Sequence, residues 1–537
     1  MTEQRESIAN EPEEDRAGRT WPFLLAMGAA AGAAGALLQL RMLRFGGVGA
    51  DQALLFWGFF LIAGVLLTLI GGALVRLVFA RENVSRALRV GAALVVPVVV
   101  LAIFLPWNRQ PRPNVLLLVT DATRADHLSV YGYDRDTTPF LREMPSIRFT
   151  NMVSTGSHTI VTTPCILASC YPSEHGIRGY SDVLSDRFTL ISEYLKGAGY
   201  ATYAYATNPH IRPGVGFGQG FDTFGHDPGW RNTPAGMVND KFLEWLDNQT
   251  VRPFFAFHFY VDPHNPYLSP PEFQRLFDPE WESGPVSDWK HELGEPEPRT
   301  LFNLLAQYDG SIAYWDAELR RLVGELERRG EYRNTLLVYT SDHGEEFWEH
   351  GEWGHQRTLF EESIHVPLIL SIPSPVRFPP LGRTSRTVEE VASSVDIVPT
   401  ILDIVRIEPD GNVRGSSLLR LALGGRESGP ERRAYCEEIL NQYGPYDMRG
   451  LRSKDRKYVM TFTYEGARDL DDGFYDLLRD PEETRNAIRD LAEEAAEHRK
   501  MLAALVREIS GRAPARVDTV EIDPATREGL RALGYLN

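Results

Sequence analysis

The 537-residue sequence has little cysteine and no basic tract, and each shortage excludes a class of protein. Its three cysteines, Cys165, Cys170 and Cys436, are too few for a disulfide-stabilised scaffold, and no cysteine and histidine cluster has zinc-finger spacing. The net charge of −17 argues against a nucleic-acid partner, because that binding requires a basic surface. With 43% hydrophobic and 24% charged residues, most of the chain is expected to be globular.

Long apolar runs are confined to the first 107 residues. Residues 21–40, 53–79 and 88–107 are each long enough to cross a bilayer core of about 30 Å. Buried helices of a soluble protein are one alternative, but these runs have no polar face. A cleaved signal peptide is another, but the first run starts after a polar stretch and has no clear cleavage site. The sequence therefore predicts three transmembrane helices.

Arginines predict how these helices are oriented. The second connector carries Arg81, Arg86 and Arg89, whereas the first has only Arg41 and Arg44. By the positive-inside rule, the N-terminal tail (1–20) and the second connector are cytoplasmic. After the membrane module (21–107) and a linker (108–113), the rest of the chain is then extracytoplasmic, either periplasmic or extracellular. The lipid bilayer is thus an expected partner.

From residue 114 onward, short apolar runs alternate with amphipathic stretches. The pattern predicts helices and buried strands, the helices over 188–198 and 301–329 and the strands over 115–119, 200–205, 254–260 and 335–340. This alternation is typical of an α/β fold, in which helices cover both faces of a mostly parallel sheet. Ligands of such sheets bind beyond the carboxyl ends of the strands, where Asp121 and Asp342 stand.

The pair Asp342–His343 places a carboxylate beside an imidazole at a strand end, which suits a divalent cation. A single Asp at such a position is more often a helix N-cap or a turn residue. The metal hypothesis therefore depends on several donors converging.

A series of motifs running from residue 114 to the chain end resembles the sulfatase-like branch of the alkaline phosphatase superfamily. In chain order they are NVLLLVTDATRADHLSVYGYDRDTTPFL from Asn114, YPSEHG from Tyr171, GFDTF from Gly220, PFFAFHFYVDPHNPY from Pro253, YDGSIAYWDAELRRL from Tyr308, TSDHGEEFWEHGEWGHQRTLFEESIHVPLI from Thr340, VDIVPTIL from Val395, FYDLLRDPEETRN from Phe474 and a terminal LRALGYL. The resemblance implies a catalytic domain over 114–430 and a small C-terminal α+β subdomain over 431–537. It also implies one active site, where a metal activates a nucleophile against a phosphate or sulfate ester.

The family's nucleophile position, twelve residues before Tyr171, falls on Thr159. Sulfatases proper carry Cys or Ser there, with Pro and Arg at fixed offsets, for conversion to formylglycine. Thr159 cannot be converted in this way, and neither the Pro nor the Arg is present. The segment CYPSE at Cys170 resembles that maturation motif, but Glu174 stands where Arg is required. Cys165 and Cys170 are instead interpreted as core residues or as a disulfide pair.

By resemblance, the metal ligands are Asp121, Thr159, Asp342 and His343. Ala122 replaces a second Asp of many sulfatases, and His343 replaces an Asn. One oxygen donor is thereby lost and a nitrogen donor gained, so zinc or manganese is favoured over calcium or magnesium.

Two further histidines, His264 and His355, match catalytic motif positions, where each would bind an ester oxygen or protonate the leaving group. Less well supported candidates are His158, His350, Arg124 and Arg357. The acidic pairs Glu345–Glu346 and Glu361–Glu362 are interpreted as solvated surface.

Three functions fit this sequence. The first is phospho-transfer or phosphodiester hydrolysis through Thr159 and a phosphoenzyme, acting on a lipid or envelope polymer. The second is hydrolysis of a sulfate ester. The third is a catalytically silent binding or scaffold protein, against which the complete ligand set argues.

Overall fold

The computed structural model describes residues 112–227, 234–281, 296–373, 385–426, 429–439, 446–463 and 471–533. Residues 111–422 together with 428–537 form one compact unit. The three predicted membrane spans, 21–40, 53–79 and 88–107, lie outside the described residues. Within the described ranges, no helix is both long and apolar enough to cross a membrane. Of the predicted fold, the α/β sheet is therefore supported, whereas the three N-terminal transmembrane helices find no support among the residues that the structure describes.

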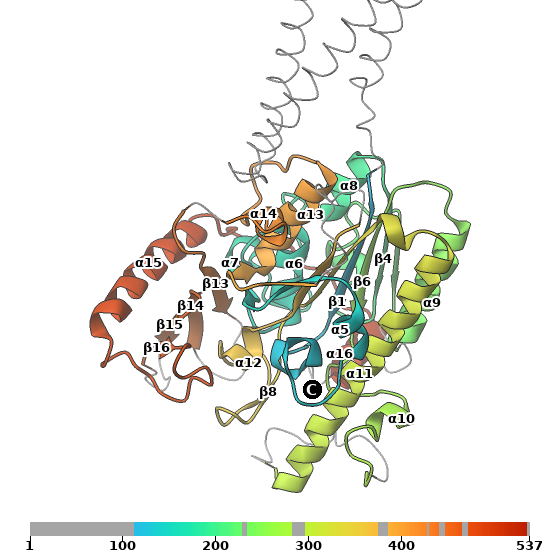
Figure 1. The fold of residues 1–537 in the computed structure, drawn as a ribbon. Coiled ribbons are helices and arrows are strands. Elements are labelled where there is room, and N and C mark those ends of the chain that lie inside the picture. Colours follow the sequence, from blue (N-terminus) through green and yellow to red (C-terminus); the bar gives the residue numbers. More distant parts are fainter. Residues whose placement is uncertain are drawn as a thin grey trace, which may run out of the picture. The chain divides into compact units, whose positions relative to one another are not determined.

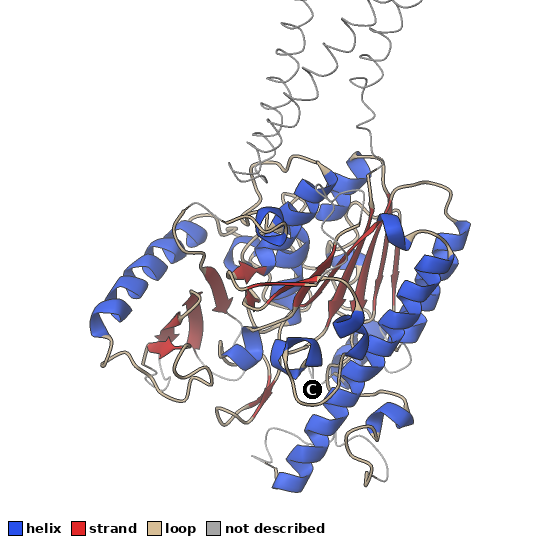
Figure 2. Cartoon of the chain, in the orientation of Figure 1, coloured by secondary structure: helices blue, strands red, loops and turns tan. Residues whose placement is uncertain are grey.

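The described residues form a central sheet of eight strands, in the order β11-β2-β10-β7-β1-β6-β4-β5 (Figures 1 and 2). Strand β10 is antiparallel to both neighbours and the other pairs are parallel. The bounds are β1 Asn114–Thr120, β2 Ile147–Phe149, β4 Ala201–Ala206, β5 Thr223–His226, β6 Phe254–Tyr260, β7 Thr335–Ser341, β10 Leu368–Ser371 and β11 Arg386–Val388. The four strands predicted from apolar runs are thus confirmed.

Helices cover both faces of this sheet (Figure 1). The α-helices of the described residues are α5 Pro139–Glu143, α6 Thr159–Ala168, α7 Pro172–His175, α8 Ile191–Gly197, α9 Ala235–Asn248, α10 Pro271–Gln274, α11 Pro298–Arg328, α12 Glu361–Ile364, α13 Ile397–Val405, α14 Leu419–Ala422, α15 Ala492–Ser510 and α16 Pro524–Ala532. Helix α8 starts later than predicted because Leu190 is extended and donates its N–H to the carboxylate of Glu193 (2.8 Å).

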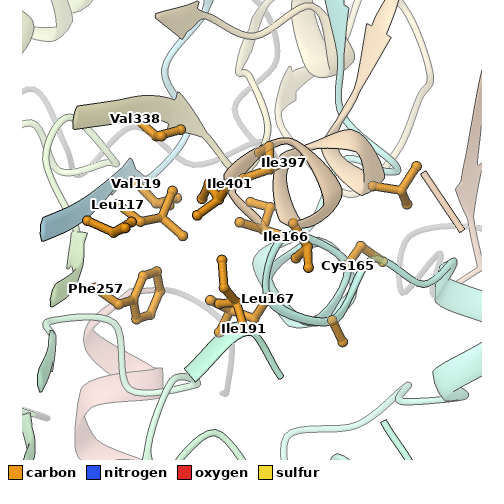
Figure 3. Close-up of a cluster of buried hydrophobic side chains, with 14 of the residues drawn as sticks. Leu117, Val119, Cys165, Ile166, Leu167, Ile191, Phe257, Val338, Ile397 and Ile401 are labelled. Atoms are coloured by element: carbon orange, nitrogen blue, oxygen red, sulfur yellow. The ribbon is translucent and has the colours of Figure 1, made fainter. Parts of the chain in front are cut away.

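Alternate residues of the central strands pack on opposite layers, as the period of a strand requires. Leu117 and Val119 of β1 face α6, α8 and α13, where Ile166, Ile191 and Ile401 complete one buried cluster (Figure 3). The intervening residues of β1, Leu116 and Leu118, pack with α9 and α11 in a second cluster. Burial on both faces explains why the strands are continuous apolar runs.

Smaller sheets flank this core. Strand β13 (Ala434–Glu438) begins an antiparallel sheet that continues with β14 Tyr446–Arg452, β15 Arg456–Thr463 and β16 Gly473–Asp476. Helix α15 packs on this sheet through Ala495, Leu502 and Ile509. Two-stranded pairs are formed by β3 Met152–Val153 with β12 Ala392–Ser393 and by β8 Glu346–Phe347 with β9 Trp353–Gly354.

Candidate metal centre and nucleophile

Parallel pairing of β1 with β7 brings Asp121 and Asp342 together. The register aligns Thr120 with Ser341, so the next residue of each strand emerges at the same edge of the sheet. His343 follows, and its Nε2 lies 3.6 Å from Asp121 Oδ1 and 3.6 Å from Asp342 Oδ2. One ligand atom from each of the three residues lies within 4.8 Å of the others. All three side chains are fully buried.

Thr159, the first residue of α6, completes the centre. Its Oγ1 lies 3.1 Å from His343 Nε2 and 3.4 Å from Asp121 Oδ1. Hydrogen bonds hold both ends of the loop that precedes α6. Ser154 Oγ donates to the Asp342 carbonyl, and Ser157 Oγ donates to Glu438 Oε2 of β13 (2.7 Å). The four residues that the resemblance implied as ligands therefore converge on one point.

The electrostatics of this cluster fit a divalent cation. Burial, and then the neighbouring Asp342 carboxylate, raise the pKa of Asp121 well above its usual value. Burial lowers the pKa of His343, but Asp342 and Asp121 outweigh it, so the net shift is upward. Asp342 Oδ2 is buried without a hydrogen-bond partner among the described residues. Two carboxylates held together in a dry site need a compensating positive charge, and a cation would supply it.

The tautomer of His343 suits metal binding. Its Nδ1 lies 2.8 Å from the Gly344 carbonyl, which can only accept, so Nδ1 carries the proton. The neutral ring then has its lone pair on Nε2, the atom that faces Asp121, Asp342 and Thr159. This arrangement is usual for a histidine that binds a metal. Asp342 Oδ1 is held by the backbone N–H groups of Ala122 (3.2 Å) and His343 (2.8 Å).

His264 and His355 lie beside this centre. The ring of His355 is 4.4 Å from that of His343 and 5.0 Å from that of His264, centroid to centroid. His264 Nδ1 is 2.5 Å from the Asn265 carbonyl, and His355 Nδ1 is 3.0 Å from Glu345 Oε1. Burial lowers the pKa of both imidazoles.

The other basic candidates have acidic or aromatic partners. His158 precedes Thr159 as the N-cap of α6, and its ring centroid lies 6.5 Å from that of His355. His350 stacks on Phe360, with its Nε2 3.4 Å from Glu362. Arg124 pairs with Asp126 (2.7 Å) and Glu349 (2.5 Å).

Arg357 is the fourth of these candidates. Its guanidinium pairs with Glu352, with Nη1 and Oε2 3.0 Å apart.

Two site residues were missed from the sequence. Asn208 follows the end of β4 and donates from Nδ2 to Asp121 Oδ2 (2.7 Å). His210 comes two residues later, its ring 6.1 Å from that of His158 and stacked at 4.6 Å on Tyr180. The signal that could have found them is the strand-end rule applied to Asp121, because β4 is parallel to β6 and ends at the same edge.

Both acidic pairs interpreted as solvated are largely buried, which corrects that prediction. Glu345 and Glu346 are each 1% exposed. Glu361 accepts from Arg452 (3.0 Å) and Lys457 (3.2 Å). Each carboxylate is buried because a specific donor or cation faces it.

All three cysteines are free in the structure, and Cys165 and Cys170 are buried in the core, which is one of the two interpretations given to them.

Comparison with known proteins places the chain in a family. The family model described as "Sulfatase" matches residues 113–407. A second, described as "N-sulphoglucosamine sulphohydrolase, C-terminal", matches residues 348–510. The first match alone spans more than half of the chain and includes every candidate site residue.

Two relatives and one solved structure are also similar to this chain. An arylsulfatase of Clostridium perfringens is 25% identical over 477 residues, covering 75% of this chain and 95% of that protein. An N-acetylglucosamine-6-O-sulfatase of Bacteroides thetaiotaomicron is 22% identical, covering 73% and 86%. The crystal structure of the phosphonate monoester hydrolase of Agrobacterium radiobacter shares the fold, with a TM-score of 0.60 and 21% identity over 74% of this chain and 96% of that one. The chain belongs to the sulfatase family.

Proposed function

We propose that the chain is a metal-dependent hydrolase of sulfate esters, or of related phosphate esters, in which Thr159 is the nucleophile. The observation that carries this proposal is the position of Thr159 Oγ1, 3.1 Å from His343 Nε2 and 3.4 Å from Asp121 Oδ1 in a buried cluster of metal-ligand type. A silent scaffold would have no need of these four residues in one place.

The residues Asp121, Asp342, His343 and Thr159 would hold the cation. A divalent cation bound there would supply Lewis acidity, which lowers the pKa of the Thr159 hydroxyl and favours its attack. The N and O donor set favours zinc or manganese. Asn208 fixes one oxygen of Asp121, and the Gly344 carbonyl fixes the tautomer of His343. The chain itself thus holds the nucleophile and its ligands in one orientation.

Sulfate ester hydrolysis is supported by the comparisons. Both matching family descriptions and the two relatives named above refer to sulfatases or a sulphohydrolase. The departure from the sulfatase pattern is Thr159 itself, which lacks the route to formylglycine.

Phosphate ester chemistry is the second candidate, and Thr159 is the observation that favours it. A threonine hydroxyl can attack phosphorus in line and form a phosphothreonine, which water or an acceptor alcohol then resolves. The extracytoplasmic location and the lipid or envelope-polymer substrate expected from the sequence depend on residues outside those described, and stay predictions.

Sulfate and phosphate esters that share one leaving group distinguish sulfate ester hydrolysis from phosphate ester hydrolysis. Purified full chain would be given aryl sulfate, aryl phosphate and bis-aryl phosphate esters of one phenol, with zinc or manganese added in turn. Sulfate release lost in Asp342→Asn supports the sulfatase assignment, whereas turnover of the phosphodiester alone supports the phosphate assignment. No turnover of any of them would contradict the proposal.

A further inference from the structure

A small cavity adjoins the candidate metal centre at His264. Its volume is about 20 Å³, and its walls include Val261, Asp262, His264, Leu268 and Ser311. A cavity of this size holds one group about as large as a water molecule. The ring of His264 lies 5.0 Å from that of His355, which lies 4.4 Å from that of His343. The cavity is therefore next to the place where an ester would bind.

Two polar side chains of this cavity lack the partners that buried groups usually have. Ser311 is 1% exposed, and its Oγ has no hydrogen-bond partner among the described residues. Asp262 is 6% exposed, and no Lys, Arg or His of the described residues pairs with its carboxylate. Burial raises the pKa of Asp262 to about 7, as expected of a carboxylate without a cation.

The Asp262 carboxylate has one structural contact that must be weighed. Its Oδ2 accepts from the N–H of Ala235 (3.1 Å), the first residue of α9. A helix N-terminus supplies only about half of a positive charge. The contact therefore orients the carboxylate but does not neutralise it.

The walls of the cavity are fixed by the fold. Val261 packs in a buried cluster with Leu530 and Leu533, which belong to the terminal LRALGYL motif, and Leu268 packs against the same cluster. The N–H of His264 donates to the Val261 carbonyl (2.7 Å). The cavity is thus formed before a ligand arrives, which lowers the cost of binding.

A primary ammonium group fits this cavity best. It is about as large as a water molecule, and it carries the positive charge that Asp262 lacks. Its three N–H donors can also reach an acceptor such as the unpartnered Ser311 Oγ. A hydroxyl would fill the same space but would leave the charge of Asp262 uncompensated. A methyl group would leave both polar side chains unpaired.

We propose that this cavity binds a primary ammonium group on the alcohol part of the ester, and that Asp262 and Ser311 recognise it. This inference rests on the proposed function, because the ester itself would lie at the metal centre. The substrates that it assigns are sulfate or phosphate esters of alcohols that carry a free amine.

Calorimetric titration of the full-length, zinc-loaded protein tests this without any turnover. The probes are alkylphosphonates, whose carbon–phosphorus bond replaces the ester bond. Each has a three- or four-carbon arm that ends in an ammonium, a hydroxyl or a methyl group. We expect the ammonium probe to bind about 10- to 100-fold more tightly than the methyl probe at the better arm length, as a charged hydrogen bond would provide.

Asp262→Asn separates recognition from the structural contact. The amide oxygen of Asn can still accept the Ala235 N–H, but the negative charge is lost. We expect the ammonium probe to bind within about threefold of the hydroxyl probe in this variant. Ser311→Ala removes an oxygen that has no partner in the fold, so folding should be unaffected. It should reduce the preference for ammonium over methyl by about 3- to 10-fold.

Asp316→Asn is the matched control. Asp316 lies on α11, as Ser311 does, and is 1% exposed. Its carboxylate also accepts backbone N–H groups, from Phe140 (2.8 Å) and Leu141 (3.0 Å). The preference for ammonium should be unchanged in this variant.

Three results would overturn the inference. The first is equal binding of the ammonium and methyl probes, or binding of none, in which case the cavity holds only a water molecule. The second is tighter binding of the hydroxyl probe than of the ammonium probe. The third is a preference for ammonium that persists in Asp262→Asn. Failure of the proposed function looks different, because the unaltered protein would then turn over no aryl ester, whichever probe it binds.

Discussion

Asp342 is the residue on which the metal hypothesis depends most. Its Oδ2 is fully buried and finds no hydrogen-bond donor among the described residues, while Asp121 is held close by. Asp342→Asn removes one ligand and one negative charge. We expect turnover to fall about a thousandfold, since a cation contributes several kcal/mol to transition-state stabilisation.

The same substitution should not destabilise the metal-free protein, because it relieves repulsion between two buried carboxylates. Urea unfolding of the chelated proteins checks this, with chelated unaltered protein as the control. A large loss of unfolding free energy in chelated Asp342→Asn would mean that the aspartate has a structural role.

The buried His175 should make the free energy of unfolding depend on pH. Its ring nitrogens are both used, because Nε2 donates to the Val161 carbonyl (3.0 Å) and Nδ1 accepts from the Ile177 N–H (3.1 Å). Burial lowers the pKa of His175 from 6.5 to about 4. The unfolded chain thus binds a proton that the folded chain excludes, so stability falls as pH decreases from about 6.5 to about 4.

The loss over that interval should be roughly 3 kcal/mol, at about 1.4 kcal/mol for each pKa unit. Chemical unfolding at a series of pH values measures it. His175→Gln should be less stable at neutral pH but should lack this part of the slope. An unchanged slope in the variant would assign the pH dependence to other groups.

At the scale of elements, the antiparallel sheet is joined to the catalytic layer by a buried ion cluster. Lys457 of β15 donates to Glu483 (2.6 Å), Glu361 (3.2 Å) and the Leu359 carbonyl (2.7 Å). Its side chain is 0% exposed. Lys457→Met would leave the buried Glu483 without its cation and Glu361 with Arg452 alone, and we expect a loss of about 3–5 kcal/mol.

Lys454 is the control for this prediction. It pairs with Glu389 at 2.8 Å, but its side chain is 47% exposed. Lys454→Met should change the unfolding free energy by less than about 1 kcal/mol, because surface ion pairs contribute little. Equal effects of the two substitutions in urea unfolding would contradict this account of the cluster.

Strand positions could be predicted from the sequence because β1, β6 and β7 are buried on both faces and form continuous apolar runs. Asp121, Asp342 and His343 could be placed for the same reason, since each follows such a strand. Asn208 could not be assigned from its own residue type, because its role exists only through its contact with Asp121. Glu345 was misjudged because its burial depends on His355 and Tyr267, whose proximity the sequence does not show.

At the scale of the whole molecule, the metal centre links distant parts of the chain. Asp121, Thr159 and Asp342 are separated by long stretches of sequence, and a cation binding all of them stabilises only the folded chain. Saturating zinc at about 100 times the dissociation constant should add about 2.7 kcal/mol to the free energy of unfolding.

Calorimetry with and without chelator measures this as a shift in Tm. The shift should disappear in Asp342→Asn. A Tm that responds to zinc equally in both proteins would place the binding elsewhere.

The central claim is that Thr159 attacks the ester. Its most direct test is peptide mass spectrometry of the metal-loaded chain, quenched during turnover of a radiolabelled ester. The account predicts a labelled adduct on the peptide containing Thr159, with label from the ester's phosphorus or sulfur, and its loss in Thr159→Ala. Turnover that persists in Thr159→Ala without an adduct at this residue would contradict it.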